Sequence, residues 1–354
     1  MKRPLRAVLV AAAVLATFVF ANAALAANTA SVAVSHTPMV LAGSQSTTIH
    51  VTIPQATDPM AAINIFVPSG YGAKVDQAAG TNIGSVEATA LSRDTGLTLP
   101  LSGTVTTDNP AAHTTDPCSP GTNAAVWMLN LSVAGQTLAV PLYVNPTSGA
   151  ATALGAYNLK ICLPPPDVPI GTPGRAFQGA QVLDAKFTVN GILTTPTAAG
   201  VPRWETLFTP YNPGKGTPNL VGTFETRAFV PLPIVLGLQA KYNKKTRVYT
   251  LTGKLTEGGQ PVSGTSVAIA RGATAAGVKK VASATTGATG SFKNTGKLKP
   301  RKTTFFQATA SAAERDYTAT GCQSPLPATV APAGCVSATL SPWTAKSATV
   351  RIKS

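Results

Sequence analysis

The sequence predicts an all-β protein made of two antiparallel β-sandwich domains. Apolar residues recur at every second position in short segments along most of the chain, which is the period of a strand with one buried face. The chain of 354 residues contains 31 Gly and 29 Pro, and clusters of them separate these segments as turn residues do. No segment shows the 3.6-residue apolar period of an amphipathic helix. Successive strands without helices between them indicate antiparallel sandwiches.

Residues 1–26 have the pattern of a cleaved secretory signal peptide. Basic residues within the first six positions precede an apolar run over 7–20, and Ala24-Leu25-Ala26 forms a cleavage motif of small residues. This run is shorter than the ~20 residues that a membrane-spanning helix needs. We therefore expect a secreted, extracytoplasmic protein with no transmembrane segment in its mature form.

The N-terminal domain is expected over residues 27–230. Its clearest alternating segments are 49–53, 127–133, 138–144, 157–161 and 183–189. Their phase predicts a buried set made of Trp127, Leu129, Leu131, Leu142, Leu159 and Phe187. A Pro/Gly-rich connecting stretch follows near 192–222, from which Trp204 and Phe208 are expected to fold back onto a domain, since free linkers rarely carry them. One more strand is expected over 222–230.

The C-terminal domain is expected over residues 231–354, after the boundary that Pro231 and Pro233 mark. Eight strands are predicted, over 234–242, 247–256, 265–271, 278–286, 291–296, 303–311, 336–340 and 348–353. In the last of them Ala348, Val350 and Ile352 are expected to face inward.

Two motifs in this domain resemble a known family. Residues 257–269, EGGQPVSGTSVAI, and residues 286–292, TGATGSF, are similar to the hairpin and turn of bacterial Ig-like and carboxypeptidase-regulatory-like modules. Gly258 and Gly259 would supply a turn, Val267 would enter the core, and Gly290 would permit a bend before a buried Phe292. The resemblance covers about a third of the chain and implies Ig-like sandwich folds, with little indication of function. The N-terminal domain resembles no family that we can name.

Cysteine usage agrees with export. An even number of cysteines in an exported chain indicates disulfides, and the four here are Cys118, Cys162, Cys322 and Cys335. Three connectivities are open, and proximity together with the domain division favours Cys118–Cys162 and Cys322–Cys335. A metal site is disfavoured because no pair has the C-x2-C spacing.

The two predicted domains differ in their net charge. Residues 28–230 carry eight basic and ten acidic residues, whereas residues 231–354 carry seventeen basic and three acidic ones. In a sequential antiparallel domain, alternate connections lie at the same end, and most of the basic residues fall in the odd-numbered connections. The candidates for binding a polyanion are Lys244, Lys245, Lys299, Arg301 and Lys302. An anionic cell-envelope polymer is the expected partner. Nucleic acid is not expected, because no nucleic-acid motif is present and export removes that partner.

No catalytic motif or cofactor fingerprint is found, so no cofactor is expected and the leading prediction is a non-enzymatic binding or structural protein. The alternative is an exported enzyme or carbohydrate-binding protein with its site on loops of the N-terminal domain. The loop Asp108–Asp116 could supply oxygen ligands to Ca²⁺, although a polar loop held by a disulfide is favoured. Trp204 and Trp343 could stack on a sugar, although packing roles are commoner.

Overall fold

The computed structural model describes residues 30–133, 135–316 and 337–354, so the predicted signal peptide at 1–26 lies outside the described residues. In these ranges the regular structure is β-strands and three short 3-10 helices, η1 (Pro110–His113), η2 (Gly149–Ala153) and η3 (Phe177–Gly179). The all-β prediction is confirmed. Across this same part of the chain, no helix is both long and apolar enough to span a membrane.

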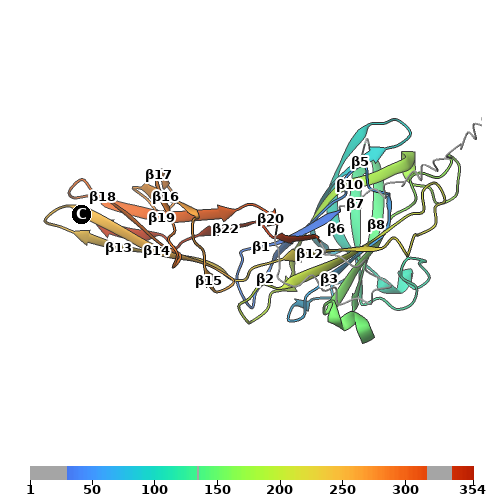
Figure 1. Cartoon of the computed structure of the whole chain (residues 1–354), viewed down its shortest axis with the longest axis horizontal. Helices are drawn as coiled ribbons and strands as arrows, with labels where there is room; N and C mark the ends of the chain where they lie inside the picture. The colour runs from blue at the N-terminus through green and yellow to red at the C-terminus, as the bar shows by residue number, and fades with distance from the viewer. Residues whose placement is uncertain (1–29, 134, 317–336) are drawn as a thin grey trace, which may run out of the picture.

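One large sheet contains the strands that precede residue 230 (Figure 1). They are β1 (Ser31–Thr37), β2 (Ser44–Thr52), β3 (Met60–Val67), β4 (Gly72–Ala73), β5 (Asn82–Ser92), β6 (Thr98–Asp108), β7 (Ala125–Val133), β8 (Gln136–Pro146), β9 (Tyr157–Cys162), β10 (Ala180–Thr194), β11 (Arg203–Pro210) and β12 (Phe224–Phe229). Their order is β1-β2-β10-β5-β6-β7-β8-β9-β3-β11-β12, with β4 beside β10. Neighbouring strands are antiparallel, for example β7 and β8, where Trp127 pairs with Leu142.

The far edge of this sheet is completed by a segment from near the C-terminus. Strand β21 (Ser337–Leu340) pairs in parallel with β12, and β20 (Arg315–Asp316) pairs with β21. The sheet curls so far that its first strand, β1, meets this edge. The two are joined there by a hydrogen bond, which the hydroxyl of Thr339 donates to the Val32 carbonyl at 3.0 Å. The arrangement of two Ig-like sandwiches is therefore not confirmed, since β1–β12 form one curled sheet. The strand predicted near 336–340 exists, but it belongs to this sheet.

The remaining strands form two sheets that pack face to face (Figure 1). One sheet holds β13 (Ile234–Asn243), β14 (Val248–Glu257), β15 (Gln260–Pro261) and β18 (Ser291–Lys297). The other holds β16 (Ser266–Gly272), β17 (Lys279–Thr285), β19 (Thr303–Ala312), β22 (Trp343–Lys346) and β23 (Val350–Lys353). Leu251 and Leu255 from the first sheet and Ile269 and Phe306 from the second are fully buried in one core. We call this unit the small sandwich.

The turn residues of the small sandwich behave as their sequence predicts. Gly258 and Gly259 both have positive φ angles, of 59° and 84°, between β14 and β15. Gly290 has a φ of 73°, and a Cβ there would lie 2.4 Å from the Leu255 carbonyl oxygen, so only glycine fits. Phe292 and Val267 are buried, as expected.

The small sandwich is joined to the large sheet at one of its two ends. The amide of Ile234, at the start of β13, donates to the Met39 carbonyl in the loop between β1 and β2. Glu257, at the end of β14, accepts from Arg315 and from the indole of Trp343. Because β14 runs from Val248 to Glu257, the turn before Val248 lies at the free end. Ten residues of strand separate the two ends by about 30 Å.

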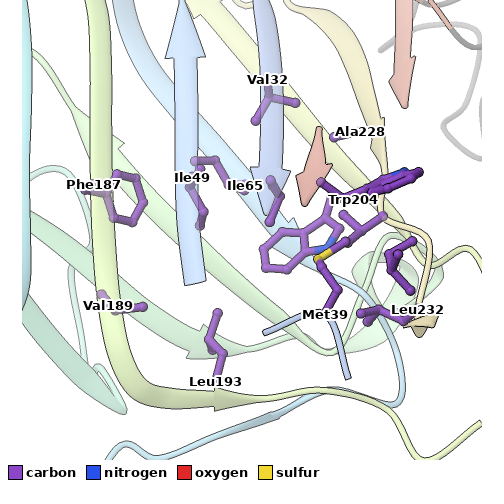
Figure 2. Packing of buried hydrophobic residues seen from close by; sticks show 14 of the residues in the cluster. Val32, Met39, Ile49, Ile65, Phe187, Val189, Leu193, Trp204, Ala228 and Leu232 are labelled. Carbon is purple, nitrogen blue, oxygen red and sulfur yellow. The ribbon is translucent and has the colours of Figure 1, made fainter. Parts of the chain in front are cut away.

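The interior of the large sheet is filled by bulky side chains at the end near the junction (Figure 2). Figure 2 shows Trp204 beside Met39 there, with Phe187 on the far side of Ile49. The predicted buried set is confirmed, since Trp127, Leu129, Leu131, Leu142, Leu159 and Phe187 are all buried.

The stretch near 192–222, which was expected to be a connection, contains a strand of the large sheet. This strand is β11, which pairs with both β3 and β12. Trp204 and Phe208 of this strand are buried, as predicted.

Cys118 and Cys162 form a disulfide, which confirms one of the two predicted bridges. It ties the loop between β6 and β7 to the end of β9. Cys322 and Cys335 lie outside the described residues, so the second bridge stays a prediction.

Replacing Leu142 by Ala should lower the free energy of unfolding by about 2–5 kcal/mol, because this fully buried side chain would leave a cavity. Urea unfolding measures the change. Leu97→Ala is the matched control, since that leucine is 62% exposed and its loss should cost under about 0.5 kcal/mol. Equal effects of the two substitutions would show that the strand phase is wrong.

Candidate functional site

The β13–β14 turn forms the first part of a basic surface at the free end of the small sandwich. Asn243 ends β13, and its side-chain oxygen accepts from the amides of Lys245 and Thr246, which fixes a tight Asx turn. Arg247 then adopts a positive φ of 57° before β14 begins. Lys244, Lys245 and Arg247 are all exposed on this turn.

The β18–β19 turn lies directly beside it. The amide of Leu298 donates to the Arg247 carbonyl at 3.0 Å, which joins the two turns through their backbones. The last residue of the chain closes the second turn, since the hydroxyl of Ser354 accepts from the Lys302 amide and lies 2.7 Å from the Lys299 carbonyl oxygen. Lys299, Arg301 and Lys302 are exposed on this turn.

A third connection contributes from the facing sheet. Arg271, at the end of β16, pairs with Lys279, at the start of β17. Arg271, Lys297, Lys299 and Lys302 line one hollow of about 360 Å³, so cations from both sheets surround the same space. We define the basic end as Lys244, Lys245, Arg247, Arg271, Lys279, Lys280, Lys297, Lys299, Arg301 and Lys302.

The acidic residues of this part of the chain lie elsewhere. Glu257 sits at the junction, where Arg315 neutralises it. Among the described residues, no carboxylate lies within ion-pair distance of Lys244, Lys245, Lys299, Arg301 or Lys302. Uncompensated charges of one sign produce a field that attracts an anion.

The five polyanion-binding candidates named from the sequence therefore gather at one end, together with the other basic connections. Sequence reasoning missed Lys353, whose partner Thr303 begins β19 at this same end. The signal was available, because β23 ends the chain beside the β18–β19 turn and Lys353 is its last strand residue. The role of these residues in binding stays a prediction.

The loop considered for metal binding uses its carboxylates internally. His113 contacts Asp116 at 2.7 Å through Nδ1 and Asp108 at 3.1 Å through Nε2, and the hydroxyl of Tyr143 donates to Asp116. Burial opposes protonation of His113, but these hydrogen bonds with Asp116 and Asp108 outweigh it and raise its pKa. No group of three or more His, Cys, Asp or Glu side chains suited to a metal ion occurs in the described ranges.

A second cluster of charged groups lies on β11 and β12. Arg227 donates to Glu205 at 3.0 Å and to Glu225 at 2.8 Å, and Arg203 also pairs with Glu205. Burial, followed by the nearby Glu225 carboxylate, raises the pKa of Glu205 to about 8. The Glu205 side chain is 0% exposed, which places this carboxylate out of reach of a dissolved substrate. The cluster is therefore read as a structural network.

Both tryptophans considered as sugar platforms are buried. Trp204 packs edge-on against Tyr71 at a ring distance of 5.4 Å, inside the large sheet. Trp343 is 4% exposed and donates its indole N–H to Glu257. Neither ring presents a face to solvent on which a sugar could stack.

Comparisons with known proteins add little. No family model matches the chain, so the resemblance to Ig-like modules is not confirmed, and no curated protein matches it. Solved structures with similarity include a putative carbohydrate binding protein from Bacteroides uniformis, at 14% identity and a TM-score of 0.21, covering 51% of this chain and 85% of that one. The full-length major pilin SpaD from Corynebacterium diphtheriae shows 12% identity and a TM-score of 0.24, covering 81% of this chain and 57% of that one. A DUF4466 family protein from Parabacteroides merdae shows 7% identity and a TM-score of 0.22, covering 92% and 99%.

His36 gives a pH-dependent prediction. It is buried between Thr47 and Tyr71, at 3.0 and 2.9 Å, and burial lowers its pKa to about 4. As pH falls from 7 to 5 the unfolded chain takes up the proton first, so the folded state should lose about 2 kcal/mol of stability. Urea unfolding at both pH values measures this loss.

His36→Gln should remove that part of the pH dependence, and the comparison is needed because His113 shifts in the opposite direction. Stability from His113 is present at low pH and is lost as pH rises through its raised pKa. An unchanged pH dependence in His36→Gln would contradict the assignment.

Proposed function

We propose that this chain is an exported, non-enzymatic binding protein of the cell envelope that docks on an anionic envelope polymer through its basic end. The observation that carries the proposal is the gathering of exposed cations from three connections at the free end of the small sandwich, four of which, Arg271, Lys297, Lys299 and Lys302, line one hollow between its two sheets. In the described part of the chain, none of the five candidate cations has a carboxylate partner. This leaves their charges available to a ligand.

A partner with many anionic groups is expected because a single exposed ion pair binds only weakly. One exposed ion pair contributes little to binding in water, and salt screens it over a Debye length of ~10 Å at 0.1 M. A polymer with repeated anionic groups can engage several cations at once, and each further contact then forms at a high effective concentration. Repeating phosphates or carboxylates therefore suit this surface better than a small anion does.

Export is supported by the Cys118–Cys162 disulfide, since such bonds persist in oxidising compartments. It also agrees with the signal peptide expected at 1–26. A stable bridge within the large sheet is typical of proteins that work outside the cytoplasm.

The alternative, an enzyme or carbohydrate-binding protein with its site on loops of the N-terminal domain, finds less support. The loop carboxylates Asp108 and Asp116 both hydrogen bond to His113, and Trp204 is buried. A sugar site would need an exposed aromatic face and free polar groups, and these candidates supply neither.

Reversing Lys244, Lys299 and Lys302 to Glu should weaken binding to a soluble polyglycerol phosphate about tenfold or more, because three attractive charges become repulsive. Binding is measured by calorimetry at 0.1 M salt. The affinity of the unaltered protein should also fall steeply as salt rises to 1 M, where the Debye length is ~3 Å.

The matched control reverses Lys74, Lys186 and Lys215, which are exposed on β10 and on two loops far from the basic end, so that the total charge changes equally. This variant should keep the affinity within about twofold, given the short range of screened charges. Equal losses in both variants would show that only net charge matters, and no loss in either would refute docking.

A further inference from the structure

The large sheet contains a second, unrelated hollow. A cavity of about 260 Å³ lies within the curl, between the inner faces of β2, β3 and β5–β10. Its walls include Val86, Leu101, Leu129, Leu131, Val140 and Ile161. Folded interiors rarely contain voids much larger than a water molecule, so this is an unfilled space of unusual size.

The residues that leave the space empty can be identified. Ala88 of β5 pairs directly with Ala185 of β10 and with Leu101 of β6, so two small side chains face the interior side by side. At the other end of the same sheet the interior positions hold Trp127 and Trp204, both fully buried. The sequence thus places bulk at one end and alanine at the other.

The cavity opens at the end of the sheet away from the small sandwich. β2 runs away from the junction, from Ser44 to Thr52. In the antiparallel strand β10, Thr194 pairs with Ser44 and Asp184 pairs with Thr52, so the residues of β10 before Asp184 lie at the end away from the junction. The lining residues Phe177 and Leu138 are 58% and 40% exposed, so apolar surface continues from the cavity to the solvent. This is the mouth of the cavity.

The chemistry of the walls restricts the occupant. In the part of the chain that the structure describes, no charged side chain lines the cavity, and its polar lining comes from Gln136, Thr137 and Gln181. Sugars would leave most of their hydroxyls unpaired there. Apolar cavities of about 150 Å³ bind benzene-sized molecules, and drug-sized ligands occupy about 300–1,000 Å³. A single hydrocarbon chain fits between these limits.

The positively charged side chain of Arg93 contacts a residue that lines the cavity. The guanidinium of Arg93 donates from Nε and Nη2 to Gln181 Oε1, at 3.1 and 2.7 Å, while Gln181 Nε2 donates to the Thr57 carbonyl. Gln181 is 2% exposed, so this network holds Arg93 against the lining. The neighbouring Arg175 is already paired with Asp94, whereas Arg93 has no carboxylate partner among the described residues.

We infer that this cavity binds the hydrocarbon chain of a fatty acid, with the carboxylate at the mouth beside Arg93. The aliphatic walls supply the affinity, because each methylene removed from water is favourable. Arg93 supplies the selectivity, since a charge-assisted hydrogen bond to a carboxylate is stronger than one to a neutral head group. The inference is independent of the basic end.

Calorimetry at pH 7 with saturated fatty acids of increasing length tests the site on the unaltered protein. Affinity should rise about fourfold for each added methylene and then level off once the cavity is full. Ala88→Phe should abolish binding by filling the space, whereas Ala139→Phe, on an exposed position of β8, should leave it unchanged. If Ala88→Phe does not fold, as judged by thermal unfolding, Ala90→Phe serves the same purpose.

The head group is tested with decanoate and decanol. Arg93→Gln should weaken decanoate about tenfold and leave decanol unaffected, because only the carboxylate loses an ionic partner. The inference is overturned if no fatty acid binds, if the filled variants bind as well as Ala139→Phe, or if Arg93→Gln affects acid and alcohol equally.

Discussion

The pairing of β21 with β12 is the contact on which the arrangement of the whole molecule depends. A sheet edge presents unpaired N–H and C=O groups, and β12 would present such an edge if the chain did not return. The return strand satisfies it, and the amide of Ser341 adds a bond to the Phe229 carbonyl at 2.9 Å. The chain therefore crosses the junction three times, since β13–β19 and β22–β23 belong to the small sandwich whereas β20 and β21 belong to the large sheet.

Closure of the sheet has a second consequence, which is an enclosed interior. A flat sheet with one buried face needs a covering layer, but a curled sheet covers itself and must fill its own lumen with side chains. The end near the junction is filled by Trp127 and Trp204. The end around Ala88 and Ala185 is not. The same fold therefore gives a packed support beneath the small sandwich and a cavity at the opposite end.

Much of this fold was predictable because strand period and turn chemistry are local properties. The phase of Trp127, Leu129 and Leu131 correctly identified an inner face, and the first six strands predicted after residue 231 agree with β13, β14 and β16–β19 within one or two residues. Strand β22 was not predicted, and Ala348, which was expected to face inward, is exposed before β23 begins. The basic end followed from simple counting of antiparallel connections. Its one omission, Lys353, resulted from treating the chain end as outside the turns.

The pairing of strands that are far apart in the sequence was not predictable, because the alternation of apolar and polar residues does not say which strands become neighbours. Ser337–Leu340 reads as an ordinary strand, and nothing in its residues shows that it leaves the small sandwich to join β12. The cavity was not predictable for the same reason. Ala88 and Ala185 are nearly a hundred positions apart, and only their register across β5 and β10 brings two small side chains together. β11 was missed for a different reason, since prolines and glycines surround it and outweighed its short apolar pattern.

The two candidate surfaces lie at opposite extremes of the molecule, and the distribution of charge gives this arrangement a physical meaning. Residues 28–230 carry a slight excess of acidic groups, whereas the basic end concentrates cations at the far side of the small sandwich. Near an anionic surface such a molecule experiences a torque that turns the basic end inward, within the ~10 Å over which charges act at 0.1 M salt. Because the chain crosses three times between the small sandwich and the large sheet at the junction, this orientation is passed on to the large sheet. The mouth beside Arg93 would then point away from the surface, where an amphiphile could enter without displacing the polymer.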